Sequence, residues 1–162
     1  MTMMQPEKFL RSMRKTPVIL AAILRNVSQE RAATATDGPD GWSVLEVMCH
    51  MRDFEGLFFR RARMMLESEN PELPGYDQNE LVKTNDYAGQ KLSAAFQDYV
   101  HVRQQFVHFL AGLNDEQWHR RGIHPDVGDI DLLELVMNVS LHDINHIEQI
   151  VRALGLSEGL IS

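Results

Sequence analysis

Two histidines four residues apart, His142 and His146, are the clearest chemical signal in the chain. Their segment has the apolar periodicity of a helix, in which residues four positions apart lie on one face, about one turn from each other. Two imidazoles on one helical face can bind the same metal ion, because neutral imidazole nitrogen is a good ligand for divalent metals. Two ligands do not complete a site, so a third must come from elsewhere.

His50 is the best candidate for the third ligand. It belongs to a second helical segment, residues 43–67, and in both segments the histidines fall at the border of the apolar face. Helix bundles use this arrangement, with ligands from facing helices, to bind metals. We therefore predict a metal site at His50, His142 and His146. The alternative is that all three are polar residues at a packing margin.

Glu46, Cys49 and Asp143 lie near these histidines in the sequence, but each is interpreted as something other than a metal ligand. Ser43 and Glu46 have capping-box spacing, so the Glu46 carboxylate is expected to bond the Ser43 backbone rather than a metal. Cys49 falls about 100° around the helix from His50 and is interpreted as an inert thiol on the outward side. Asp143 lies within an apolar face, where a carboxylate needs a partner. It either orients a histidine ligand or, as the favoured alternative, forms a buried ion pair with an arginine.

The histidine pair also invites comparison with zinc peptidases. In those enzymes a glutamate follows the first histidine and acts as the base that activates water. Here Asp143 occupies that position, and its side chain is shorter than that of glutamate. No further ligand of the expected kind follows before Ser162. Peptidase activity is therefore not expected.

The composition of the 162-residue chain suits one domain, spanning residues 1–162. The net charge of −7 argues against nucleic acid as a partner, because phosphate binding needs clustered positive side chains. The single cysteine excludes an internal disulfide and suits the reducing cytoplasm. Residues 1–15 lack the apolar core of a signal peptide, and the longest apolar run, 18–24, is too short to cross a membrane. We expect a soluble cytoplasmic protein.

Apolar periodicity predicts four main helices and almost no strand. In the first, Thr16 is the expected N-cap, Pro17 the first residue and Val27 the last, and a separate short helix at 5–13 is expected before it. The other three are expected at 43–67, at about 85–113, and at 131–154 with Gly155 closing the last. The expected fold is all-α with no β-sheet. The long connection around 71–83 can cross a bundle, which permits two neighbouring helices to run in the same direction.

The chain resembles the DinB/YfiT-like family of metal-dependent enzymes over nearly its whole length. The resemblance rests on Gly41-Trp42-Ser43, on Glu46 and His50, on Asp53 and Glu55, and on His142-Asp143-x-x-His146-x-x-Gln149-Ile150. It implies a four-helix bundle with up-down-down-up topology, usually dimeric. It also implies a divalent metal, often nickel or zinc, held by His50, His142 and His146.

The function that the resemblance implies is less uniform. Some branches of the family use low-molecular-weight thiols such as mycothiol or bacillithiol in transferase and isomerase reactions. A three-histidine site with an open position suits this chemistry, since the metal can make a thiol or a water anionic near neutral pH. We therefore expect a metal-dependent enzyme with a small-molecule substrate, and prefer thiol transfer. The alternatives are a metal-dependent hydrolase and a non-catalytic helical dimer with a structural metal or none.

Overall fold

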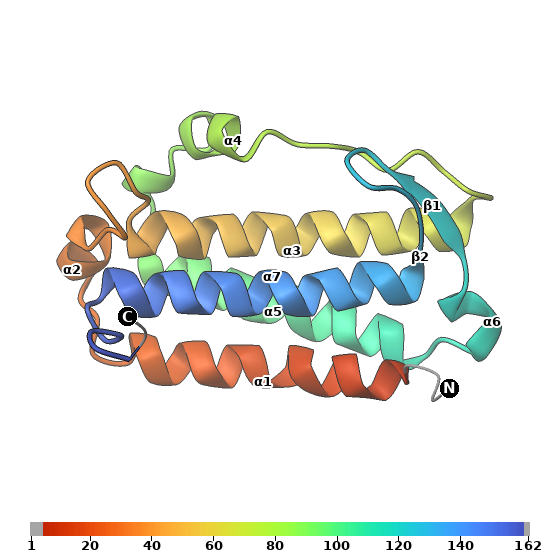
Figure 1. Cartoon of the computed structure of the whole chain (residues 1–162), viewed down its shortest axis with the longest axis horizontal. Helices are drawn as coiled ribbons and strands as arrows, with labels where there is room; N and C mark the ends of the chain where they lie inside the picture. The colour runs from red at the N-terminus through yellow and green to blue at the C-terminus, as the bar shows by residue number, and fades with distance from the viewer. Residues whose placement is uncertain (1–4, 161–162) are drawn as a thin grey trace.

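Four long helices lie side by side in the computed structural model, which describes residues 5–160 (Figure 1). They are α1 (Pro6–Leu24), α3 (Val44–Glu67), α5 (Leu92–Ala111) and α7 (Leu132–Ala153). In Figure 1, α1 and α7 run in one direction and α3 and α5 run in the other. The predicted all-α four-helix bundle with up-down-down-up order is confirmed. Residues 1–4 and 161–162 of the expected domain lie outside the described residues.

The parallel direction of α3 and α5 depends on the connection between them, which returns along α3 (Figure 1). It contains α4 (Gln78–Thr84) and the 3₁₀ helix η1 (Tyr87–Gly89). The Asp53 carboxylate on α3 fastens it by accepting hydrogen bonds from Asn85 Nδ2 at 2.9 Å and from the Tyr87 hydroxyl at 2.6 Å. The prediction that the third helix starts near residue 85 is wrong, because Asp86 has a left-handed backbone with φ of 44°, which interrupts a helix.

The first helix also differs from the prediction, since α1 is continuous through Pro17 and Thr16 is not an N-cap. A proline inside a helix has no N–H for the carbonyl four residues earlier, here that of Met13. In this protein Arg103 Nη1 donates to the Met13 carbonyl at 3.0 Å. A side chain from α5 therefore replaces the bond that Pro17 removes.

A small β-hairpin contradicts the expectation of no β-sheet. Its strands, β1 (Arg121–His124) and β2 (Gly128–Asp131), pair antiparallel with Arg121 opposite Asp131. Each strand has four residues, which is too short for an alternating pattern to stand out in the sequence. Gly128 adopts φ of 81° at the turn. The short helices α2 (Gln29–Thr34) and α6 (Asp115–Trp118) complete the described elements.

The predicted helix starts are confirmed where capping residues define them. Ser43 with Glu46 and Asp131 with Glu134 form complete capping boxes at the beginnings of α3 and α7. These two helices carry the three candidate ligands, so their start points set the register of the site. Within residues 5–160, no helix combines the length and apolar character that a membrane crossing requires.

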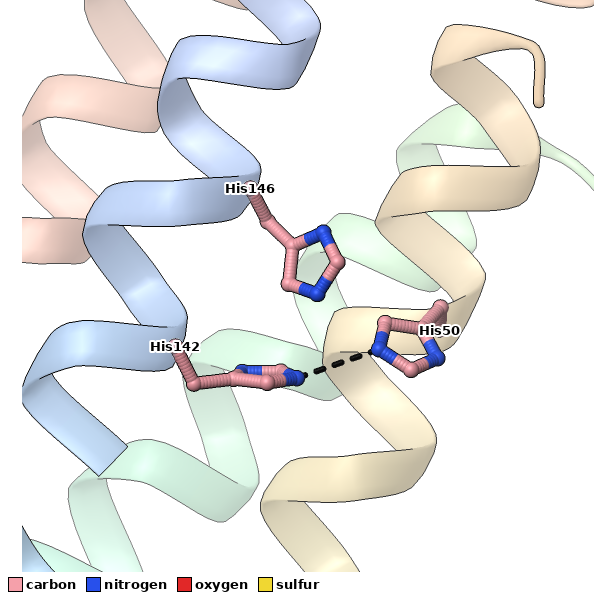
Figure 2. A group of neighbouring side chains, drawn as sticks. All are labelled: His50, His142 and His146. Atoms are coloured by element: carbon pink, nitrogen blue, oxygen red, sulfur yellow. Dashed lines mark hydrogen bonds between the residues drawn. The ribbon is translucent and has the colours of Figure 1, made fainter. Parts of the chain in front are cut away.

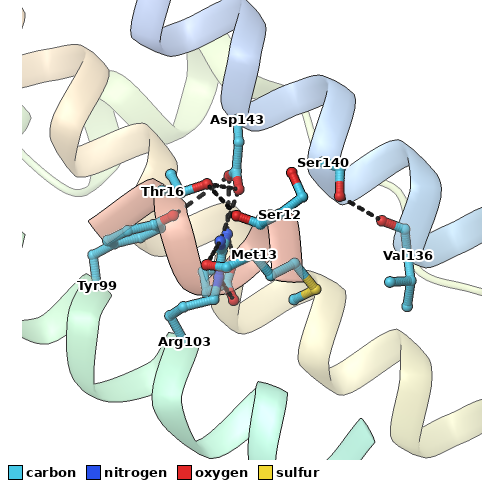
Figure 3. A network of polar contacts seen from close by, with 9 residues as sticks. Ser12, Met13, Thr16, Tyr99, Arg103, Val136, Ser140 and Asp143 are labelled. Atoms are coloured by element: carbon cyan, nitrogen blue, oxygen red, sulfur yellow. Dashed lines mark hydrogen bonds and ion pairs between the residues drawn. The ribbon is translucent and has the colours of Figure 1, made fainter. Parts of the chain in front are cut away.

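A buried polar layer lies between the two apolar clusters of the bundle core. Figure 3 shows its hydrogen bonds and ion pairs. At its centre, the Arg103 guanidinium donates to both oxygens of Glu55 at 2.6 and 2.7 Å and to both oxygens of Asp143 at 2.7 and 2.9 Å. With the bond to Met13, all five N–H groups of Arg103 have an acceptor. Thr16 donates to Asp143 at 2.8 Å. The favoured interpretation of Asp143, a buried ion pair with an arginine, is confirmed.

We predict that Arg103→Met lowers the free energy of unfolding by about 3–5 kcal/mol, because it leaves two carboxylates buried without their cation. Urea unfolding followed by circular dichroism measures the change. Arg63→Met is the matched control, since the Arg63–Glu67 pair is exposed and should contribute little. Equal stability of the Arg103 variant and the wild type would contradict the role given to this layer.

Candidate metal centre

The structure brings the three predicted histidines together (Figure 2). His50 extends from α3, and His142 and His146 extend from successive turns of the antiparallel helix α7. The Nε2 atoms of His50 and His142 are 3.1 Å apart, and one ring nitrogen from each residue lies within 4.8 Å of the other two. Residues 92 positions apart in the chain thus form one cluster.

Aromatic side chains enclose this cluster on the α3 side. The ring centroid of Phe54 lies 4.2 Å from that of His50 and 5.6 Å from that of His142, nearly parallel to the latter. Trp42 lies 5.1 Å from His50, and Phe58 meets His142 edge-on at 5.2 Å. These walls keep water away from His50, which is 1% exposed. Among the described residues, its Nδ1 atom has no hydrogen-bond partner.

Burial keeps the three imidazoles neutral. It lowers the pKa of His50 from 6.5 to about 3, with a further contribution from the neighbouring His146. The same two causes, burial first, hold the pKa of His142 well below its usual range. Burial also lowers the pKa of His146. Neutral imidazole has a free nitrogen lone pair, which is the form that binds a metal.

The geometry of the cluster fits a metal ion. Two nitrogens at the usual ligand distance of about 2.0–2.1 Å lie roughly 3.3 Å apart around a tetrahedral ion and roughly 2.9 Å apart around an octahedral ion. The separation of 3.1 Å between the Nε2 atoms of His50 and His142 falls between these values. A set of three imidazoles suits zinc and nickel among the common divalent metals.

His146 also lines a surface pocket of about 380 Å³. The other lining residues come from the same helix: Ile144, Asn145, Glu148, Gln149 and Arg152. His50 and His142 are not among them, so this pocket lies beside His146 rather than at the point where the three rings meet.

The contacts of Glu46 and Cys49 test how these two residues were interpreted from the sequence. The Glu46 carboxylate accepts from the Ser43 N–H at 2.7 Å, as predicted, and is not a member of the cluster. The prediction that Cys49 faces outward is wrong, since it is fully buried near Gln90 in the α3–α5 connection. Burial raises the pKa of the Cys49 thiol to about 11, which agrees with its interpretation as inert.

Sequence reasoning gave no role to two residues that support the ligands, although Gln149 was named in the family resemblance. Gln149 Oε1 lies 2.7 Å from His146 Nδ1, and Gln149 Nε2 donates to Asp37 Oδ2 at 2.9 Å. Gln149 lies three residues after His146 on the same helix, and this spacing could have identified it. No pattern in the sequence connects Asp37 to a helix more than 100 residues later.

The model of the DinB superfamily matches residues 13–150 of this sequence. The chain belongs to the DinB superfamily. YfiT from Bacillus subtilis (strain 168), which is proposed to be a metal-dependent hydrolase, is 25% identical over 158 residues, covering 94% of this chain and 88% of YfiT. OB0413 from Oceanobacillus iheyensis, which is described in the same way, is 21% identical over 131 residues, covering 81% of this chain and 74% of OB0413.

Two solved structures share the fold of this DinB protein. YfiT, described as a four-helix bundle of unusual topology, superposes with a TM-score of 0.82 at 24% identity, over 96% of this chain and 90% of YfiT. The mycothiol-dependent maleylpyruvate isomerase superposes with a TM-score of 0.75 at 12% identity, over 91% of this chain and 61% of the isomerase. The metal-dependent relatives and the three-histidine geometry together support a divalent metal as the cofactor.

We predict that the metal-free protein loses stability as the pH falls below 6.5. The unfolded chain then binds protons that the buried histidines exclude, so each histidine lowers the free energy of unfolding by up to about 1.4 kcal/mol per pH unit. Above 6.5 both states are unprotonated at these positions and the effect is absent. Urea unfolding at pH 7.5 and 5.5 measures the slope. His50→Phe should reduce this dependence of the free energy of unfolding on pH. An unchanged slope would show that folded His50 accepts a proton.

Proposed function

We propose that this DinB protein is an enzyme that binds one divalent metal through His50, His142 and His146. The observation that carries the proposal is three neutral imidazoles whose ring nitrogens converge in one cluster. Zinc or nickel is the metal that this donor set favours. When bound, the metal would act as a Lewis acid that lowers the pKa of a thiol or a water.

The nucleophile should come from solution, because the described helices offer none at the site. The Cys49 thiol is buried, and its pKa is raised. The Ser140 hydroxyl is also buried and donates to the Val136 carbonyl on its own helix at 3.4 Å. The side chains of this protein would then bind the metal and exclude water on the aromatic side, and the reacting molecules would come from solution.

We prefer a low-molecular-weight thiol as that nucleophile, in a transferase or isomerase reaction on a small-molecule substrate. The mycothiol dependence of an isomerase with the same fold supports this choice. A metal-dependent hydrolase is the second candidate, and it is supported by the description of YfiT and OB0413. A non-catalytic dimer with a structural metal is the third. Structural zinc usually has four protein ligands, whereas the cluster here has three.

We further propose that the protein is a cytoplasmic homodimer that does not act on nucleic acid or membranes. The net charge of −7 and the single cysteine support this proposal. On α7, Leu141 is 52% and Ile144 is 59% exposed. Exposed apolar side chains of this size commonly lie at subunit contacts. Light scattering after gel filtration would measure the mass in solution.

We predict one equivalent of divalent metal in protein purified without a histidine tag. His50→Ala should lose most of it, because two imidazoles bind a divalent ion more weakly than three. His108→Ala is the matched control, since His108 is exposed on α5. Metal analysis by mass spectrometry measures the ratio. Full occupancy in the His50 variant would make the three-histidine assignment wrong.

We predict that mycothiol, bacillithiol or glutathione adds a sulfur-to-metal charge-transfer band to the absorption spectrum of the cobalt-substituted protein. The physical reason is direct contact between the thiol sulfur and the ion at the open position. If no thiol changes the spectrum while a simple ester or amide is hydrolysed, the hydrolase is the correct function. If neither occurs and the ion exchanges no ligand, the structural role is correct.

A further inference from the structure

A chain of hydrogen bonds connects His146 of the candidate metal centre to the loop between α2 and α3. The ring nitrogen Nδ1 of His146 is 2.7 Å from Gln149 Oε1, and Gln149 Nε2 donates to Asp37 Oδ2 at 2.9 Å. Asp37 lies in the loop between α2 and α3. Arg152 Nη1 donates to the same Asp37 oxygen at 3.3 Å. Two residues of α7, Gln149 and Arg152, therefore contact the same carboxylate of this loop, and Gln149 connects it to His146.

The direction of each bond follows from the chemistry at the Asp37 end. A carboxylate only accepts hydrogen bonds, so the NH₂ group of Gln149 must face Asp37. The amide oxygen of Gln149 then faces His146, and because this oxygen only accepts, His146 Nδ1 must carry the proton. In a neutral imidazole the other nitrogen, Nε2, then has the free lone pair. Nδ1 is engaged with Gln149, so Nε2 is the atom left to share with His50 and His142 (Figure 2).

The other two histidines lack a comparable arrangement among the described residues. His50 Nδ1 has no hydrogen-bond partner. For His142, the only ring contact of this kind is the one between its Nε2 and that of His50. The hydrogen bonds of the protein thus select the tautomer of His146 alone.

Gly41 provides the space that this arrangement needs. A Cβ atom at Gly41 would lie 1.9 Å from Asp37 Oδ1 and 3.0 Å from its Cγ, so any other residue would displace the carboxylate. The backbone of Gly41 is not in the left-handed region, so its conformation does not require glycine. The next two residues serve the same site, since Trp42 packs on His50 and Ser43 caps α3.

We propose that Asp37 and Gln149, with the space left by Gly41, are positioning residues that select the His146 tautomer with its proton on Nδ1 and its lone pair on Nε2. The use of this tautomer in metal binding rests on the proposed function, whereas the tautomer itself does not. A purely structural tie between the loop and α7 would hold the helix in place and leave the tautomer unaffected.

The test is the position of the proton on His146 in the metal-free protein at pH 8, read from long-range proton–nitrogen correlations of ¹⁵N-histidine-labelled protein. We expect the wild type to carry the proton on Nδ1. Gln149→Met removes the acceptor and should yield a mixture of tautomers or the opposite one. Gln105→Met is the matched control, because Gln105 is exposed on α5. An unchanged His146 tautomer in Gln149→Met would overturn the proposal.

A swapped pair tests the direction of the bonds. Gln149→Glu alone keeps an acceptor for His146, so the proton should stay on Nδ1, but it places two carboxylates against each other, so Asp37 should move away. Adding Asp37→Asn supplies a donor opposite that acceptor, which should return the loop to its place and keep the proton on Nδ1. A proton on Nε2 in either variant, in a protein with a native circular dichroism spectrum, would contradict the assigned directions.

Gly41→Ala tests the space requirement, with Gly56→Ala as its control because a Cβ at Gly56 meets no atom within 4 Å. In the wild-type background Gly41→Ala should weaken zinc binding by about 10–100-fold, the usual effect of losing a partner that orients a ligand. In an Asp37→Ala background it should have no further effect. An equal additional loss there would refute the steric argument. If the wild type binds no metal, the proposed function fails while the tautomer measurement still decides the present proposal.

Discussion

The arginine at the centre of the bundle is the interaction on which the rest of the structure depends. Arg103 on α5 reaches Met13 on α1, Glu55 on α3 and Asp143 on α7, so a single side chain ties all four long helices together. Because each of its five N–H groups has an acceptor, rotating or sliding any one helix would leave a buried polar group unpaired. The layer therefore specifies how the helices fit together more than it adds to stability.

The same layer sets the position of the candidate metal centre. Asp143 is adjacent to His142, and the ion pair directs that side of α7 inward, which leaves the histidines facing α3. Glu55, five residues after His50 on α3, forms the other ion pair with Arg103 and so fixes the rotation of α3 about its axis.

Short-range patterns predicted much of this architecture, and long-range contacts account for what they missed. The pair His142 and His146 and the capping boxes follow from spacing within one helix. His50 was found because it lies at the border of the apolar face of a second helix. The inward position of Cys49 depends on a connection that crosses α3, and periodicity on one helix cannot reveal a neighbour on another side. The contact of Asp37 with Gln149 similarly joins a loop to a distant helix.

The proline in α1 has a consequence for the order of assembly. Without Arg103, the carbonyl of Met13 has no donor inside its own helix, and the segments on either side of Pro17 are each shorter than the roughly 12–15 residues that an isolated helix needs to persist in water. A continuous α1 therefore forms only once α5 is in place beside it. The residue that completes α1 therefore lies 90 positions along the chain from the carbonyl that it satisfies, so this helix depends on a contact that closes a long loop.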